Sequence, residues 1–383
     1  MNRYRILTCV LLVFLLGTLV GCGAQPTAPP EPTQAPEPAP TEAPAPTQAP
    51  EAEPTEAAEA PTAAVEEEPV DVKGLTLGVI YLTLEHPYYQ AHSKHTQKYA
   101  EELGITLVEI DGKADAAVMA SAMEDLIAQG VDGIIFCLID PAAAVPSIQE
   151  AQAAGIPVVT FAIRHGEGAH APFVGIPESV ATEEAGHLAA KKFLEQFGAD
   201  AQAYVATVEC PAIQAVVDRA DGFVKGFTDE IPSAEIVARV DGECMRDTAL
   251  TASEDLILAH PEVNVVYGGN GDSALGALAA LQGAGRGTVD DVLLISHDAS
   301  EPELIELVNP ESGLKLSVAN LPLELARATI DTVAEVIQGT RPMDEDTDVP
   351  IAAEVLTPDD LNYLNQFMAE QYLSDTDLSE YAK

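Results

Sequence analysis

Aromatic and polar side chains follow several apolar runs of this sequence, near the point where each run ends. Tyr88 and Tyr89 come soon after the first run, and Asn270 and Asp298 follow two later runs. Aromatic rings offer flat apolar faces, whereas amide and carboxylate groups form paired hydrogen bonds with neighbouring hydroxyls. This set of groups suits a small ligand that has apolar C–H faces and a ring of hydroxyls, as a sugar has.

The same side chains also have purely structural interpretations. One of Tyr88 and Tyr89 can belong to the core, as many aromatic residues do. Asn270 can cap the helix that follows it, and Asp298 can cap a helix that begins near Pro302. Capping and ligand binding are compatible at the end of a strand, so both interpretations stay open.

Histidines near the two tyrosines raise a metal site as another alternative. His92 and His95 lie at helical spacing and His86 precedes them, but no carboxylate or cysteine completes a metal shell. We interpret them as solvated helix residues and expect no metal and no cofactor. The sequence contains neither a Gly-x-Ser-x-Gly elbow nor a phosphate-binding P-loop. We therefore expect no catalytic residue and no enzyme.

Short apolar runs alternate with amphipathic stretches from Leu75 onward, which predicts alternating strands and helices. Expected strands lie at 75–81, 105–110, 133–139 and 156–161, with helices at 88–103, 116–129 and 141–154. After an irregular stretch at 164–172, expected helices lie at 179–197, 213–229, 248–260 and 273–283, with strands at 203–208, 235–240, 263–267 and 292–295. This rhythm predicts an α/β fold of two doubly wound parallel sheets, which bind ligands outside the carboxyl ends of their strands.

Segments at these strand ends resemble the type I periplasmic sugar-binding proteins, the ribose-binding-like group. The matching segments are LEHPYY (84–89), GIPVVT (155–160), RADGF (219–223), GNGDSALGA (269–277), SHD (296–298) and ANLP (319–322). The resemblance implies the type I periplasmic binding protein fold, in which two lobes joined by a three-segment hinge close on a ligand. It carries the family's ligand contacts onto His86, Tyr88, Tyr89, Asn270, Asp298 and Asn320.

The sequence departs from this family at several ligand positions. Where ribose binders have an Asp-Arg pair after the fourth strand, this chain has FAIRH at 161–165, and an arginine of a later family segment falls on Val217. The aromatic residue expected near Cys244 is also absent. A site that lacks these groups selects a different ligand from ribose. Further candidates at strand ends or in the matching segments are Glu85, Asp140, Arg164, His165 and Arg219.

The N-terminal sequence predicts export and a lipid anchor. Arg3 and Arg5 precede an apolar run that is too short for a permanent membrane-spanning helix. LVGC at 19–22 resembles the lipobox of bacterial lipoproteins, in which the signal is cut before the cysteine and the sulfur carries a diacylglycerol. We expect a signal peptide at 1–21 and lipidation of Cys22. The stretch at 22–72, rich in Pro, Ala, Thr and Glu, predicts a disordered tether.

The net charge limits the classes of binding partner, and the cysteine content limits the covalent and metal sites that we expect. The formal net charge of -44 excludes nucleic acid, because phosphate binding needs clustered lysines and arginines. Beyond Cys9 and Cys22, three cysteines remain: Cys137, Cys210 and Cys244. Their number is odd and their spacing is unpaired, so we expect neither a disulfide framework nor a zinc motif.

The body divides into two lobes and an extension. We expect lobe 1 at 73–175 and 321–345, lobe 2 at 176–320 and 346–357, and a C-terminal extension at 358–383 that forms a helix packed on a lobe. The leading hypothesis is a substrate-binding lipoprotein, anchored to the outer face of the cytoplasmic membrane, that brings a monosaccharide or polyol to the permease of an ABC importer. The alternative is a receptor that presents a ligand such as a furanosyl autoinducer to a sensor or chemoreceptor.

Overall fold

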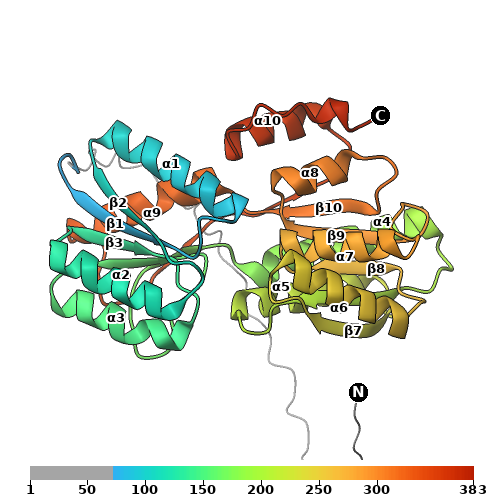
Figure 1. The fold of residues 1–383 in the computed structure, drawn as a ribbon, viewed down its shortest axis with the longest axis horizontal. Helices are drawn as coiled ribbons and strands as arrows, with labels where there is room; N and C mark the ends of the chain where they lie inside the picture. Colours follow the sequence, from blue (N-terminus) through green and yellow to red (C-terminus); the bar gives the residue numbers. More distant parts are fainter. Residues whose placement is uncertain (1–71) are drawn as a thin grey trace, which may run out of the picture. The chain divides into compact units, whose positions relative to one another are not determined.

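The computed structural model describes residues 72–383, so the predicted signal peptide, Cys22 and the tether up to Asp71 lie outside the described residues. Within this range the chain forms two six-stranded sheets (Figure 1). One has the strand order β11-β5-β4-β3-β1-β2 and the other β12-β10-β9-β8-β6-β7. The pairings are parallel except that of β12 with β10, which is antiparallel. The predicted fold class is confirmed.

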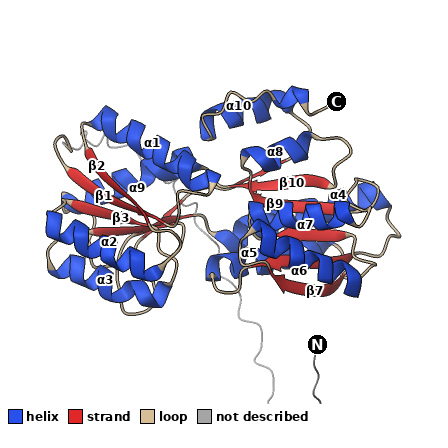
Figure 2. Ribbon diagram, in the orientation of Figure 1, coloured by secondary structure: helices blue, strands red, loops and turns tan. Residues whose placement is uncertain are grey.

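Lobe 1 is built on the first sheet. Its strands are β1 (Thr76–Tyr81), β2 (Thr106–Asp111), β3 (Gly133–Phe136), β4 (Val158–Phe161), β5 (Phe173–Gly175) and β11 (Asp348–Pro350). Helices α1 (Pro87–Leu103) and α9 (Pro322–Ile337) cover one face, and α2 (Ala116–Gln129) and α3 (Pro141–Ala153) cover the other (Figure 2). Because the central strands are apolar on both faces, each face has its own buried cluster.

Lobe 2 repeats this arrangement on the second sheet. Its strands are β6 (Tyr204–Glu209), β7 (Glu235–Asp241), β8 (Val265–Gly268), β9 (Leu293–Asp298), β10 (Leu314–Ala319) and β12 (Glu354–Leu356). Helices α4 (Glu178–Phe197) and α5 (Gln214–Glu230) cover one face, and α6 (Arg246–Ala259) and α7 (Gly271–Gly283) cover the other. A short helix, α8 (Glu301–Val308), packs with the C-terminal helix α10 (Leu361–Gln371), which precedes a 3-10 turn at Leu378–Glu380.

Helices α4 and α5 approach each other closely because glycines face the contact. A Cβ atom at Gly222 would overlap the carbonyl oxygen of Ser179, and one at Gly226 would overlap that of Glu183. The absence of a side chain at both positions lets the two backbones touch. This contact fixes the start of α4 beside the middle of α5, which matters for the site described below.

The chain passes between the lobes three times. The first passage is Ile176–Pro177, between β5 and α4, and the second is Asn320–Leu321, between β10 and α9. The third lies at 351–353, between β11 and β12. Because β11 pairs with β5 in the first sheet, lobe 1 extends to Pro350, beyond the boundary expected at residue 345.

Two expectations about individual side chains are wrong. Cys210 and Cys244 form a disulfide that joins the ends of β6 and β7, although 34 residues separate them in sequence. His92 and His95 are buried rather than solvated: His92 stacks on Phe161, with ring centroids 4.6 Å apart. Burial lowers the pKa of His92 to about 3, so this imidazole is neutral.

In residues 72–383, no helix combines the length and apolar character that crossing a bilayer requires.

Candidate ligand site

Asp298 lies at the centre of a polar network at the carboxyl end of β9. Its carboxylate accepts hydrogen bonds from the Gly271 amide at 3.1 Å and from the Asn320 side chain at 2.8 Å. Its backbone has a φ of 106°, a conformation that residues other than glycine seldom adopt. Such conformations persist where the surrounding contacts hold them, and they concentrate at binding sites.

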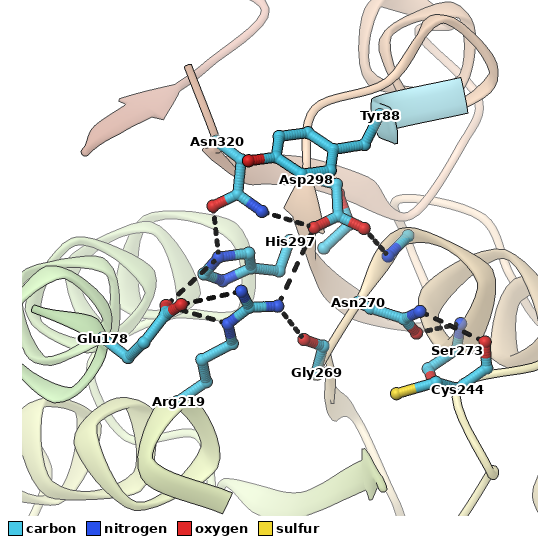
Figure 3. A network of polar contacts seen from close by, with 12 residues as sticks. Tyr88, Glu178, Arg219, Cys244, Gly269, Asn270, Ser273, His297, Asp298 and Asn320 are labelled. Atoms are coloured by element: carbon cyan, nitrogen blue, oxygen red, sulfur yellow. Dashed lines mark hydrogen bonds and ion pairs between the residues drawn. The ribbon is translucent and has the colours of Figure 1, made fainter. Parts of the chain in front are cut away.

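Arg219 lies between two acidic groups. Its Nε and Nη2 atoms donate to the two carboxylate oxygens of Glu178, each at 2.8 Å, and Nη1 donates to the Gly269 carbonyl at 3.1 Å (Figure 3). Nη1 also lies 3.8 Å from the Asp298 carboxylate. Burial raises the pKa of Glu178, and the positive charge of Arg219 opposes that shift. With two acidic groups and one guanidinium, this cluster has a deficit of positive charge.

His297 and Asn320 extend the network with a defined direction. Asn320 donates through Nδ2 to Asp298, so its Oδ1 is free to accept from His297 Nε2 at 3.2 Å. His297 Nδ1 then accepts from the hydroxyl of Tyr267 at 3.2 Å. Burial, followed by the charge of Arg219, lowers the pKa of His297 well below its usual range, so one neutral tautomer satisfies both contacts.

Lobe 1 contributes His86 and two tyrosines. His86 Nδ1 accepts from the Tyr88 amide at 3.3 Å and so caps α1, while Nε2 lies 3.6 Å from the Asp298 carboxylate in lobe 2. Tyr88 and Tyr89 pack edge to face, with centroids 5.0 Å apart. Tyr89 points into lobe 1, where its hydroxyl accepts from the Cys137 thiol at 3.6 Å. Both rings belong to the buried cluster of lobe 1, and a ligand contact of Tyr88 stays a prediction.

Tyr88 lines a small pocket between the lobes. The other lining residues are Ala162, Gly175, Ile176, Glu178, Arg219, Asn320, Leu321, Leu325 and Ile351, which come from both lobes and all three passages. The pocket measures about 10 Å³, which is room for a single water molecule. A larger ligand therefore requires the lobes to move apart before it can enter.

Asn270 serves as a helix cap in the network. Its Oδ1 accepts from the Ser273 amide at 2.9 Å, and its Nδ2 donates to the Cys244 carbonyl at 3.2 Å (Figure 3). The cap interpretation of Asn270 is thus confirmed. The corresponding interpretation of Asp298 is wrong, because Ser300 caps α8 through a capping box and Asp298 instead binds the first amide of α7.

Four residues predicted from sequence bind other partners. Asp140 caps α3, and Arg164 pairs with Asp348 at 2.7 Å. His165 lies 3.2 Å from the Asp346 carboxylate, and the exposed Glu85 has its amide bonded to Thr83. The structure brings together the remaining candidates, which are His86, Tyr88, Arg219, Asn270, Asp298 and Asn320, with Tyr89 behind them.

Sequence reasoning missed three members of the network, which are Glu178, Tyr267 and His297. His297 directly precedes Asp298 at a strand end, so its position alone was a usable signal. Glu178 follows a passage between lobes and meets Arg219 only because α4 and α5 pack closely, which no local pattern reveals.

One group in the described part of the chain has the composition of a cation site. Glu183, His187 and Asp229 present ligand atoms within 4.8 Å of one another on α4 and α5. The ammonium of Lys225 already contacts Glu183 at 2.6 Å and Asp229 at 2.8 Å. The group therefore has its counter-ion from the chain itself.

Comparison with known proteins identifies relatives that cover 70% or more of this chain. The ribose import binding protein of Bacillus subtilis is 27% identical over 270 residues, which cover 70% of this chain and 84% of that protein. A solute-binding protein of an ABC transporter from Mycobacterium smegmatis, solved with bound glycerol, is 28% identical with a TM-score of 0.66 and covers 74% of this chain and 94% of its own.

A further solved structure shows the same fold. The myo-inositol binding protein of Caulobacter has a TM-score of 0.65 at 21% identity, and the match covers 76% of this chain and 95% of that one. The profile of the periplasmic binding protein domain matches residues 77–341, more than half of the sequence. The chain therefore belongs to the family of periplasmic binding protein domains.

Proposed function

We propose that this chain is the substrate-binding protein of an ABC importer and binds a monosaccharide or related polyol between its lobes. The observation that carries the proposal is the network of Asp298, Arg219 and Asn320. Arg219 and Asn320 of this network line a pocket between the lobes together with the ring of Tyr88. Carboxylate, guanidinium and amide groups match the donors and acceptors of ring hydroxyls, and an aromatic face matches C–H groups. The relatives named for ribose import and for myo-inositol binding, and the one solved with bound glycerol, have ligands of this chemical class.

The charge of the site favours a neutral ligand. The carboxylates of Glu178 and Asp298 share the single guanidinium of Arg219. Most N–H donors of this guanidinium already bind Glu178 and Gly269. Little positive charge is left for a phosphate or a carboxylate on the ligand. A neutral sugar or polyol is therefore expected to bind more tightly than its phosphorylated or acidic counterpart.

A thermal-shift screen of the purified full chain tests the proposal. Pentoses, hexoses, polyols, nucleosides and amino acids are compared, and a ligand at a hundred times its Kd adds about 2.7 kcal/mol of stability. Asp298→Asn is expected to abolish the response, whereas Asp115→Asn, at an exposed cap of α2, retains it. A response to amino acids or nucleosides alone would overturn the sugar assignment.

We further propose export and a lipid anchor on Cys22, which lies outside the described residues. The lipobox-like LVGC at 19–22 supports it. Several acyl chains on one residue, at about 0.8 kcal/mol per buried methylene, hold a protein on a membrane without a spanning helix. Cells producing the chain are fractionated by detergent phase separation. The native chain is expected in the detergent phase and Cys22→Ser in the aqueous phase, and equal partition would contradict the anchor.

A further inference from the structure

We propose that the C-terminal extension, residues 358–383, is a strap that joins the Asp298 loop of lobe 2 to lobe 1, with Gln371 and Tyr372 as positioning residues for the ligand site. Helix α10 lies in this segment, beside α8 (Figure 1). The segment lies beyond residues 77–341, the part of the chain that matches the family profile. The role of the strap in ligand binding rests on the proposed function, whereas its contacts with the two lobes do not.

The strap is attached to lobe 2 mainly by apolar packing. Its buried side chains Leu364, Phe367 and Met368 share one cluster with Leu304 and Leu307 of α8. Past the helix, Ser374 and Thr376 donate to the carboxylate of Glu301, at 3.0 and 2.6 Å. Separating this interface would expose apolar surface to water, so the strap is expected to remain on lobe 2 when the lobes part.

Lobe 1 meets the strap through polar contacts of Gln371 and through Ala91 of α1, which shares the apolar cluster of the strap. The Gln371 carbonyl accepts from His95 Nε2 at 2.9 Å, its Oε1 accepts from the Leu323 amide at 3.1 Å, and its Nε2 donates to Glu324 at 2.8 Å. Beside these bonds lies a cavity of about 240 Å³ lined by α1, α9 and the strap. Water can replace hydrogen bonds of this kind at small net cost. This contact is therefore the one expected to release on opening.

Tyr372 connects the same point to the ligand site. Its hydroxyl donates to the backbone carbonyl of Asp298 at 2.7 Å, while its ring is buried in the apolar cluster. Asp298 and Ala299 have φ values of 106° and 53°, so this turn needs outside contacts to stay in place. By holding the carbonyl, Tyr372 fixes the direction of the Asp298 carboxylate, which in turn accepts from the Gly271 amide.

Gln371 and Tyr372, which are consecutive in sequence, thus link Asp298 to α1 and α9 of lobe 1. The contact between His86 and Asp298 spans the same two lobes from the other side. The strap is expected to favour the closed arrangement even without a ligand and to slow ligand release. A ligand only has to supply the remaining part of the closing free energy.

The first experiment measures closure of the full chain without any ligand. Spin labels are attached at the exposed positions Asp125 of α2 and Glu254 of α6, through a ketone-bearing amino acid that leaves the cysteines untouched. Gln371→Ala removes the two side-chain bonds to lobe 1 and is expected to lower the closed-to-open ratio roughly tenfold. The matched control is Gln366→Ala, because the Gln366 side chain bonds only within α10, to Glu370. Identical distance distributions for Gln371→Ala and native chain would overturn the strap.

The second experiment tests the positioning role of Tyr372. Tyr372→Phe keeps the buried ring and removes only the hydroxyl. The readout is hydrogen exchange of the Gly271 amide, which reports the position of the Asp298 carboxylate. Exchange is expected to be roughly tenfold faster than in the native chain. In the control Tyr363→Phe, the lost bond goes to Glu354, away from this turn, and exchange at Gly271 stays native. Equal exchange in the two variants would overturn the role of Tyr372.

Both measurements are independent of ligand. A screen without any sugar response would therefore refute the proposed function and leave these results to decide the strap alone. Conversely, a chain that binds sugar yet shows native distances in Gln371→Ala and native exchange in Tyr372→Phe would refute the strap alone.

Discussion

Replacing Arg219 with methionine is expected to lower the free energy of unfolding by about 3–5 kcal/mol at neutral pH, the usual effect of removing one partner of a buried ion pair. Methionine retains most of the apolar stem, so the loss is mainly electrostatic. The variant loses two charge-assisted bonds to Glu178 and one bond to Gly269. What remains is a buried carboxylate without its counter-ion, close to the charge of Asp298.

The same reasoning fixes the pH dependence of this loss. Burial already raises the pKa of Glu178 in the native chain, and removal of Arg219 raises it further. A carboxyl whose pKa is higher in the folded than in the unfolded state loses stability as pH rises through the folded pKa. The deficit of the variant is therefore expected to be largest above the raised folded pKa of Glu178, and to shrink as the pH falls towards the ordinary pKa of a glutamate, about 4.3.

Urea unfolding of the full chain, followed by circular dichroism at several pH values, measures the effect. Arg246→Met is the control, because its pair with Asp272 spans 3.1 Å at a half-exposed position and contributes below about 1 kcal/mol. The double variant Arg219→Met with Glu178→Gln is expected to recover most of the loss. A single-variant loss no greater than that of Arg246→Met, or one that does not depend on pH, would refute the buried-pair reasoning.

Three further predictions concern the scaffold, and urea unfolding of the full chain checks each one. Gly226→Ala is expected to destabilise by about 1–3 kcal/mol because its methyl has no space against α4, whereas Gly283→Ala, at an open position, is neutral or stabilising; equal effects would contradict the close helix contact. In the native chain, the buried imidazole of His92 stays neutral between about pH 6.5 and 3, whereas the unfolded chain takes up the proton. This difference lowers the free energy of unfolding by up to about 1.4 kcal/mol for each pH unit of acidification, and His92→Phe is expected to remove that slope. An unchanged slope would show that His92 is not the group concerned. Replacing Cys210 and Cys244 by serine opens a loop of 34 residues and is expected to cost about 3–4 kcal/mol, and no loss would mean that the pair is not bonded in solution.

The elements that the sequence predicted well are those whose signal is local. Central strands such as Val265–Gly268 are short apolar runs between helices with clear ends, and the structure has them within a few residues of the expected bounds. The same reasoning located Asp298, because the carboxyl ends of parallel strands meet at one edge. Asn320, by contrast, came from the resemblance to the sugar-binding family, since the strand before it was not predicted.

Features that depend on long-range contact escaped prediction. The bond between Cys210 and Cys244 follows from the neighbouring positions of β6 and β7, not from cysteine spacing. Glu178 reaches Arg219 only through the glycine contact between α4 and α5. A strand of three residues such as Asp348–Pro350 has no periodicity to detect, so the boundary of lobe 1 was placed too early.

The segment from β11 to β12 connects the two sheets and restricts their relative rotation. Parallel pairing with β5 fixes its first part, and antiparallel pairing with β10 fixes its last. The Ile351 amide is bonded as well, to Gly175 at 2.9 Å. Rotation of one sheet against the other must then be absorbed by the few dihedrals around Ala352 and Ala353. Neither residue is a glycine or a proline, so these dihedrals have only the ordinary range of an alanine, and this limits how far the sheets can turn.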